Sequence, residues 1–292
     1  IWDESLTAAV TLAREEGELA VECAAANNLV TAHESSGIPE RGRELVDGAI
    51  DRAVELHLTE WRHQYEAMRV NLACHAGDYA AVLADGARLL AEQLRPMTRR
   101  QVQMTTCLAL IDTGRIDDAY AMIETIIAEQ GADDTFQESV HFHRAEALLW
   151  DGKPARALAE WPAHREHTAS SMDLLAFSAA TFAWAALLAG EAQPDFGELT
   201  PTTKMCSAAP FELTGVAALQ AERFDDATEQ FDRAAGMWQP YNARNTIRCR
   251  WGAAESLRRA GHTDQAVTRL LEAEREASEH EMIPLLGQIR GS

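Results

Sequence analysis

The sequence is poor in positive charge. Its 292 residues include 26 Lys and Arg against 46 Asp and Glu, which gives a formal net charge of −20 at pH 7. Binding to nucleic acid depends on clustered Lys and Arg side chains that neutralise phosphates. We therefore expect no direct nucleic-acid contact by this chain.

Long apolar runs and a leader are also lacking. The most apolar stretch, Leu174 to Gly190, is shorter than the roughly 20 residues that cross a bilayer, and its Ala, Ser and Thr content favours a buried helix. No charged, apolar, small-residue leader opens the sequence. We expect no membrane partner. The opening, IWDESLTAAVTLAREEGELA, begins as if inside a helix, so we expect a piece of a longer protein.

Cysteine is sparse and scattered. The five cysteines form no Cys-x-x-Cys pair; they are Cys23, Cys74, Cys107, Cys206 and Cys249. This pattern is typical of reduced, buried thiols in a cytoplasmic protein rather than of a disulfide framework or a zinc site.

Motifs that carry chemistry are missing. The sequence has no GxxxxGK[ST] phosphate loop, no GxSxG turn and no HExxH. Two Glu-x-x-His pairs, Glu60/His63 and Glu138/His141, lie two repeats apart, and His164/His167 is an isolated pair; we expect structural or solvated side chains rather than metal ligands. The sequence thus predicts no catalytic residue, no metal and no cofactor.

What is present is a repeated turn. A glycine is followed five residues later by a small residue, as in Gly114-Arg-Ile-Asp-Asp-Ala119, and the turns recur about every 38 residues. The turn glycines are Gly37, Gly77, Gly114, Gly152, Gly190 and Gly261, and Glu222 stands at one further turn. Glycine ends one helix and the small residue lets the next helix pack closely. The spacing predicts an all-α fold, a right-handed α-α superhelix (solenoid) of about seven helix pairs.

Three prolines interrupt this pattern after Gly190; they are Pro194, Pro201 and Pro210. Because proline ends helices, residues 190–210 are expected to form a loop or a degenerate repeat, and a candidate hinge. The expected organisation is therefore helical repeats over 1–189, this segment, and C-terminal repeats over 211–292.

A solenoid usually binds through the face lined by the first helix of each pair. Counting back from each turn, the residues expected on this face are Asn27, Thr31, Gln64, Asn71, Met104, Phe142, Glu146, Trp150, Trp251 and Glu255. Amides, acids and aromatic rings together suit a peptide or a small polar ligand. The alternative is that they are ordinary helix-surface and inter-repeat residues.

The turn pattern resembles the tetratricopeptide repeat. The resemblance rests on the small residue before each turn, the turn glycine and the early alanine of the second helix. The period of this sequence is a few residues above the roughly 34 of that family. The resemblance implies a solenoid that binds other proteins.

The last stretch carries a second resemblance. Residues 247–290 contain IRCRWGAAESLRRAGHTDQA and HEMIPLLGQIR. These residues, and the segment from Arg41 to Glu92, resemble the helical region of large ATP-binding LuxR-type (MalT-like) transcriptional regulators. The resemblance implies a middle region, between an ATPase and a DNA-binding domain, that senses an effector small molecule or partner protein and takes part in self-association. A stand-alone repeat adaptor that binds a peptide or a helix is the alternative; an enzyme is disfavoured.

Overall fold

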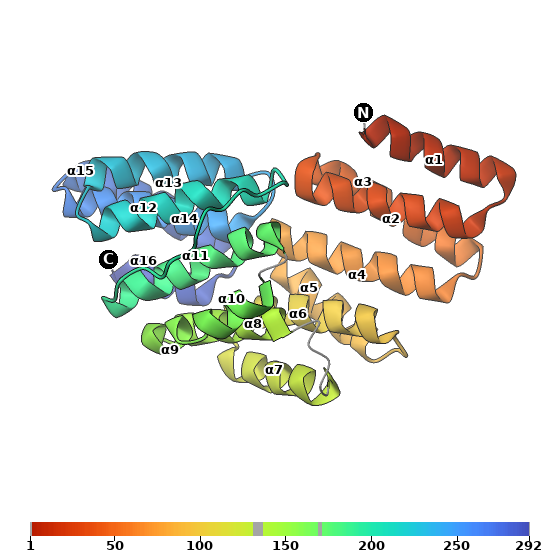
Figure 1. Ribbon diagram of the computed structural model, residues 1–292, viewed down its shortest axis with the longest axis horizontal. Helices are drawn as coiled ribbons and strands as arrows, with labels where there is room; N and C mark the ends of the chain where they lie inside the picture. The colour runs from red at the N-terminus through yellow and green to blue at the C-terminus, as the bar shows by residue number, and fades with distance from the viewer. Residues whose placement is uncertain (1, 131–136, 169–170, 292) are drawn as a thin grey trace. The chain divides into compact units, whose positions relative to one another are not determined.

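The computed structural model describes residues 2–130, 137–168 and 171–291, and all regular structure in these ranges is helical, with no strand among them (Figure 1). The chain divides into two compact units, residues 1–105 and 106–292. The helices of unit 1 are α1 (Trp2–Glu16), α2 (Leu19–Ser36), α3 (Pro39–Glu55), α4 (Thr59–Ala76) and α5 (Tyr79–Leu90). One helix, α6 (Pro96–Asp112), begins in unit 1 and ends in unit 2.

The described elements of unit 2 are helices as well. Its helices are α7 (Ile116–Gln130), α8 (Gln137–Trp150), α9 (Pro154–Leu158), α10 (Trp161–Thr168), α11 (Met172–Ala189), η2 (Cys206–Ala208), α12 (Ala209–Gln220), α13 (Phe224–Trp238), α14 (Ala243–Arg259), α15 (Thr263–Glu279) and α16 (Ile283–Gly291). The prediction of an all-α fold of repeated helix pairs is confirmed.

We call the helix directly before a predicted turn an inner helix, and the helix that follows the turn an outer helix. The inner helices are α2, α4, α6, α8, α11, α12 and α14, which lie before the turns at Gly37, Gly77, Gly114, Gly152, Gly190, Glu222 and Gly261. The same backbone hydrogen bond recurs at six of these turns: the N–H after the turn residue donates to a carbonyl of the preceding helix, as from Arg115 to Leu110 at 2.8 Å. At Gly37 the following N–H, that of Ile38, donates to His33 Nδ1 at 3.3 Å instead. The other turn residues adopt the left-handed conformation with positive φ. Gly37, with φ −104°, does not.

The small residues five positions after the turns are buried as predicted. Ala119, Ala157 and Ala227 are fully buried, and so is Val82. The closest approach lies around Phe231 of α13, which is held between two glycines. A β-carbon on Gly215 of α12 or Gly252 of α14 would lie 2.9 Å from the Phe231 ring. These glycines therefore set the distance between α12, α13 and α14.

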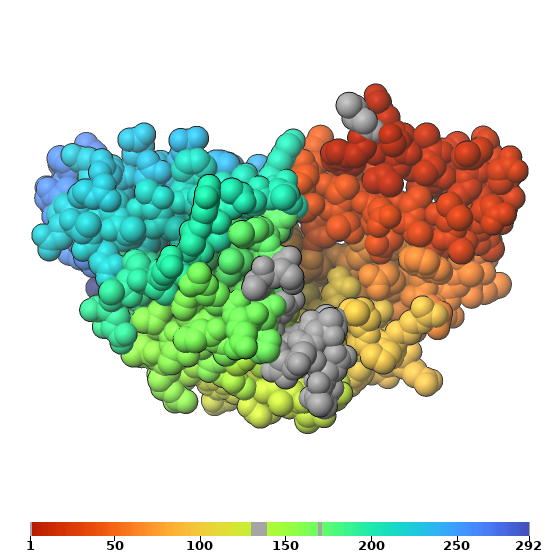
Figure 2. All heavy atoms as spheres, viewed as in Figure 1, coloured from red at the N-terminus to blue at the C-terminus, as the bar shows by residue number. Residues whose placement is uncertain are grey.

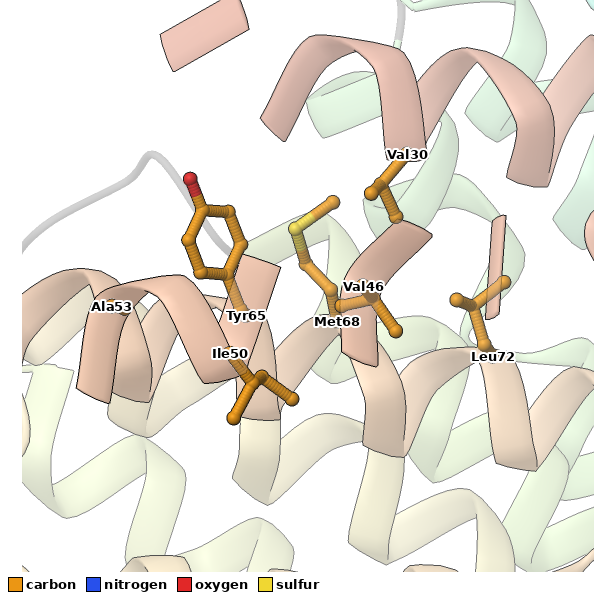
Figure 3. Packing of buried hydrophobic residues seen from close by; sticks show 7 residues of the cluster. All are labelled: Val30, Val46, Ile50, Ala53, Tyr65, Met68 and Leu72. Carbon is orange, nitrogen blue, oxygen red and sulfur yellow. The ribbon is translucent and has the colours of Figure 1, made fainter. Parts of the chain in front are cut away.

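Unit 1 has a core of its own, built by α2, α3 and α4 (Figure 3). Its members are apolar apart from one phenol; they are Val30, Val46, Ile50, Ala53, Tyr65, Met68 and Leu72. The Tyr65 hydroxyl donates a hydrogen bond to the Cys23 carbonyl at 2.9 Å, so the phenol group is satisfied inside this core.

One outer helix is replaced by a loop. Residues 191–205, between α11 and η2, contain no helix and lie at the surface of unit 2 (Figure 2). The backbone N–H groups of Thr202 and Thr203 donate to the Asp173 carboxylate at 2.8 and 3.0 Å, and both hydroxyls donate to it as well. Near its start, the Gln193 amide donates to the Ala183 carbonyl at 3.1 Å. The loop is thus bound to α11 near both of its ends.

The inner helix α11 is unusually apolar. Among the described helices it is the one long and apolar enough to cross a membrane by length and composition, with a mean hydropathy of 1.6. Since 61% of it is buried inside the protein, it also fits the core helix of a globular unit. Its aromatic contacts agree with this role: the Trp184 ring stacks on Trp251 of α14 at 4.9 Å.

A left-handed turn residue that is not glycine generates a stability prediction. Glu222 has φ 58°, which a side chain with a β-carbon adopts at a cost of about 1–2 kcal/mol, partly offset by the backbone entropy that glycine loses. We expect Glu222→Gly to raise the free energy of unfolding by about 0.5–1 kcal/mol in urea denaturation. The control is Gly114→Ala, which should lower it because φ is 76° there and the new β-carbon would lie 3.2 Å from Ile283. Loss of stability in Glu222→Gly would contradict the turn assignment.

Candidate partner-binding groove

All ten residues expected on the binding face lie on inner helices. Five belong to unit 1: Asn27 and Thr31 on α2, Gln64 and Asn71 on α4, and Met104 on α6. The other five belong to unit 2: Phe142, Glu146 and Trp150 on α8, and Trp251 and Glu255 on α14. The two sets have different surroundings.

In unit 1 the inner helices are linked by side-chain amides and hydroxyls. The Thr98 hydroxyl donates to Gln64 Oε1 at 3.1 Å, and Gln64 Nε2 donates to Gln101 Oε1 at 3.4 Å. Further along, the Asn71 amide donates to the Glu34 carboxylate, and the Thr105 hydroxyl donates to Asn71 Oδ1 at 3.2 Å. Gln64 and Asn71 are therefore partly engaged in holding α2, α4 and α6 together.

A cavity of 360 Å³ opens along this polar row. Its wall combines amides, one hydroxyl, one indole and a charged pair; it is lined by Ala24, Asn27, Asn28, Glu60, Trp61, Gln64, Arg95 and Thr98. The Arg95 guanidinium and the Glu60 carboxylate form an ion pair, and the Trp61 ring stacks on Tyr65 with centroids 5.8 Å apart. We call this the α2–α4 cavity.

The α2–α4 cavity brings together only two of the expected residues, Asn27 and Gln64. Thr31 is exposed outside it, with its hydroxyl bonded to the Asn27 carbonyl at 3.0 Å, and Met104 does not line it. Sequence reasoning missed Asn28 and Trp61. The signal for both was weak: Asn28 adjoins Asn27, and Trp61 precedes Gln64 by about one helical turn.

Glu34 of α2 is the acid that accepts the hydrogen bond from the Asn71 amide. Burial raises the pKa of the Glu34 carboxyl to about 7, although the hydrogen bond from the Asn71 amide favours its charged form. The Nδ1 atom of His75 lies 3.5 Å from Glu34 Oε1. The raised pKa means that the fold disfavours the ionised form of Glu34.

In unit 2 the inner face is filled by the chain's own charges. Glu146 of α8 is 1% exposed, and its Oε2 atom lies 2.6 Å from Arg244 Nη1 of α14. The Trp150 indole N–H donates to Glu146 Oε2 at 2.8 Å, and the Thr181 hydroxyl of α11 donates to Oε1. Arg248 Nη1 lies 3.8 Å from Oε1.

A second carboxylate completes this buried network. Glu212 of α12 is fully buried and accepts from Arg248 Nε at 2.7 Å. Both of its oxygens also accept an indole N–H, from Trp184 and from Trp238, each at 2.9 Å. On the far side, Arg244 Nε lies 3.3 Å from Asp112 Oδ2 at the end of α6. One set of charges thus connects α6, α8, α11, α12, α13 and α14.

The pKa shifts of Glu146 and Arg248 favour their charged forms. Burial alone would raise the pKa of Glu146, but Arg244 and Arg248 hold it below its usual value. Burial alone would lower the pKa of Arg248, but Glu212 and Glu146 raise it. Mutual pairing therefore offsets the desolvation of both signs of charge.

Two of the expected residues are buried. Glu146 is enclosed by its own chain, and Phe142, 4% exposed, packs edge-on against Phe177 at 5.9 Å. Arg244 and Arg248 cover Glu146, whereas neighbouring aromatic rings cover Phe142. Trp150 is engaged by Glu146 as well.

Trp251 and Glu255 lie at a smaller depression. It measures 210 Å³ and is lined by residues of α11, α12, α14 and α16, including Gly291 at the end of α16. The Glu255 carboxylate is held by Arg258 at 2.7 Å and by Arg259 at 2.6 Å, and Trp251 is 4% exposed beneath it. Charge pairing thus occupies the acid that was expected to meet a ligand.

The histidine pairs have protein partners. His63 Nε2 lies 2.9 Å from Glu92 Oε2, and Glu60 pairs with Arg95. His164 Nε2 is 2.6 Å from the Ser178 hydroxyl. The Glu138 side chain lies outside the described residues. Among the residues that are described, no group of three or more His, Cys, Asp or Glu side chains is placed to hold a metal ion.

The repeated helix pairs and their turns define a helical repeat region of the kind that binds other proteins. Residues 73–167 match the family model described as tetratrico peptide repeat, a range that includes the turns at Gly77, Gly114 and Gly152. No curated protein matches the chain. This part of the chain is thus similar to tetratricopeptide repeats, and the match supports a protein-interaction role.

The raised pKa of Glu34 generates a pH prediction. Because the Glu34 pKa rises from the ordinary 4.5 to about 7, its ionisation opposes folding increasingly as pH rises from 4.5 to 7, and the penalty is complete above that range. We expect Glu34→Gln to match the wild type at pH 4.5 and to exceed it by up to about 3 kcal/mol at pH 8. Urea denaturation at both pH values measures this, with exposed Glu40→Gln as the control. Equal stability of Glu34→Gln and wild type at pH 8 would refute the assignment.

Proposed function

We propose that unit 1 binds a segment of a partner protein in the α2–α4 cavity. The observation that carries this is the pair of side-chain amides at its wall. Asn27 and Asn28 line the cavity, and within the described part of the chain their side chains make no hydrogen bond. An amide can both donate to and accept from a peptide group, so two of them can hold an extended backbone with little regard to its sequence.

The rest of the cavity adds selectivity. Trp61 presents an aromatic surface, which suits an apolar side chain of the partner. Arg95 and Glu60 pair at the wall with 66% and 58% of their side chains exposed, so either can exchange its partner for a charge on the bound segment at little cost. The preferred segment is extended, with one apolar residue beside a charged one.

The parent protein is proposed on other grounds. We infer from residues 247–290 that the chain is the signal-sensing and self-association region of a cytoplasmic LuxR-type transcriptional regulator, whose ATPase and DNA-binding domains flank it. In that role the region is non-catalytic, and an effector or partner protein changes self-association of the regulator. A stand-alone adaptor would use the same cavity, and the match over residues 73–167 does not distinguish the two proteins.

Selection of peptides tests the binding proposal. A library of random twelve-residue peptides displayed on phage is selected on the wild-type chain, and the affinities of synthetic copies are measured by fluorescence polarisation. We expect Asn27→Ala and Asn28→Ala each to weaken binding at least tenfold, since each loses hydrogen bonds to the peptide backbone. Thr31→Ala, which changes α2 outside the cavity, is the matched control. The proposal fails if no peptide is enriched or if the asparagine variants bind like Thr31→Ala.

The reading frame on either side of residues 1–292 tests the parent protein. We expect a phosphate loop upstream and a helix-turn-helix after Ser292. A start codon directly before Ile1 together with a stop codon directly after Ser292 would refute the regulator and leave the adaptor.

A further inference from the structure

Unit 1 has a second cavity, which shares no lining residue with the α2–α4 cavity. It measures 390 Å³ and lies between α1, α2 and α3, with Tyr65 of α4 at its wall. Most of its wall is apolar: Val10 of α1, Ala26 and Leu29 of α2, and Leu45, Ala49 and Ala53 of α3. This volume and lining are those of a small-molecule site. We call it the α1–α3 cavity.

One buried carboxylate lies in this wall. The Glu22 side chain is only 4% exposed, and its Oε1 atom accepts from Arg14 Nε at 2.8 Å and from Arg52 Nε at 3.3 Å. Its Oε2 atom is buried and has no hydrogen-bond partner in the described part of the chain. Burial would raise the pKa of Glu22, but the two arginines hold it below its usual value, so this oxygen is an acceptor without a donor.

The cavity wall carries further polar groups, among them the Tyr65 hydroxyl, the Arg41 guanidinium and the Glu44 carboxylate. The Tyr65 hydroxyl already donates to the Cys23 carbonyl at 2.9 Å. Arg41 of α3 is exposed, and its only ion pair among the described residues is a long one, 3.7 Å from Glu44. The cavity therefore combines an apolar body, a buried acceptor and an accessible guanidinium.

We propose that the α1–α3 cavity binds a small hydroxy acid with an apolar body. The ligand hydroxyl donates to Glu22, the apolar body lies against Leu29 and Leu45, and the ligand carboxylate meets Arg41. A neutral hydroxyl suits Glu22 better than an ammonium group, because Arg14 and Arg52 already surround that carboxylate with positive charge. This site does not depend on the proposed function, since it takes a different ligand at a different set of residues.

Matched ligands test the chemistry. The probe is 8-hydroxyoctanoate, whose apolar chain separates its hydroxyl from its carboxylate, as most of α3 separates Arg52, the partner of Glu22, from Arg41. It is titrated into the purified chain by isothermal titration calorimetry beside two analogues. One is octanoate, which lacks the hydroxyl, and the other is 1,8-octanediol, which lacks the carboxylate. We expect 8-hydroxyoctanoate to bind at least tenfold more tightly than either. Glu22→Gln should remove the preference for the hydroxyl, and Arg41→Gln the preference for the carboxylate.

Two glycine substitutions test the location. Gly48 of α3 lines the cavity and a β-carbon there meets no atom within 4 Å, so Gly48→Leu fills the cavity without a backbone clash. Gly236→Leu, at an exposed position of α13, has the same free space and is the control; leucine favours a helix more than glycine at both positions, so both variants fold. We expect Gly48→Leu to abolish 8-hydroxyoctanoate binding and to leave peptide binding unchanged, and Gly236→Leu to bind 8-hydroxyoctanoate like the wild type. Failure of 8-hydroxyoctanoate to bind the wild type, or binding that survives Gly48→Leu, would overturn the proposal.

Discussion

The structure of unit 2 depends on the pairing of charges inside it. Glu146 and Glu212 are removed from water, as are Arg244 and Arg248. A buried charge is tolerated only when opposite charges and hydrogen bonds surround it, and here each carboxylate has an arginine of α14 and an indole N–H as partners. The relative positions of the surrounding helices are therefore fixed by directional contacts as well as by apolar packing.

The same pairing decides which inner surfaces remain open. In unit 2, the arginines and indoles occupy the inner face, so binding a partner there would require this network to be broken. In unit 1, the inner face carries amides and hydroxyls instead of buried ion pairs, and Asn27 and Asn28 keep their amides available at a cavity. The proposed binding site lies in unit 1 for this reason: Gln64 and Asn71 are partly engaged between helices there, but Asn27 and Asn28 are not.

Much of the fold could be predicted from local rules. A left-handed turn favours glycine and a close helix contact favours alanine, so the repeated turns indicated the helix pairs. Counting back from the turns also identified the inner helices. These features depend on residues near one another in the sequence, where periodicity carries the information.

The binding face could be predicted only in part. That Arg244 and Arg248 would meet Glu146, some hundred residues earlier, depends on how whole repeats pack, which no spacing reveals. Arg248 and Arg258 belong to the same helix, yet Arg248 is buried against Glu212 while Arg258 lies at the surface with Glu255. The α1–α3 cavity was likewise invisible, because it arises where three helices leave space between them.

The most direct test of this account is a double-mutant cycle between Arg248 and Glu212, measured by urea denaturation with Arg248→Met, Glu212→Gln and the double variant. The single Arg248→Met should cost about 3–5 kcal/mol, since it leaves buried carboxylates without their cation. The double variant should lose at least about 1 kcal/mol less than the two singles together. If the two losses simply add, the buried charges do not act as one network, and the structural role assigned to them is wrong.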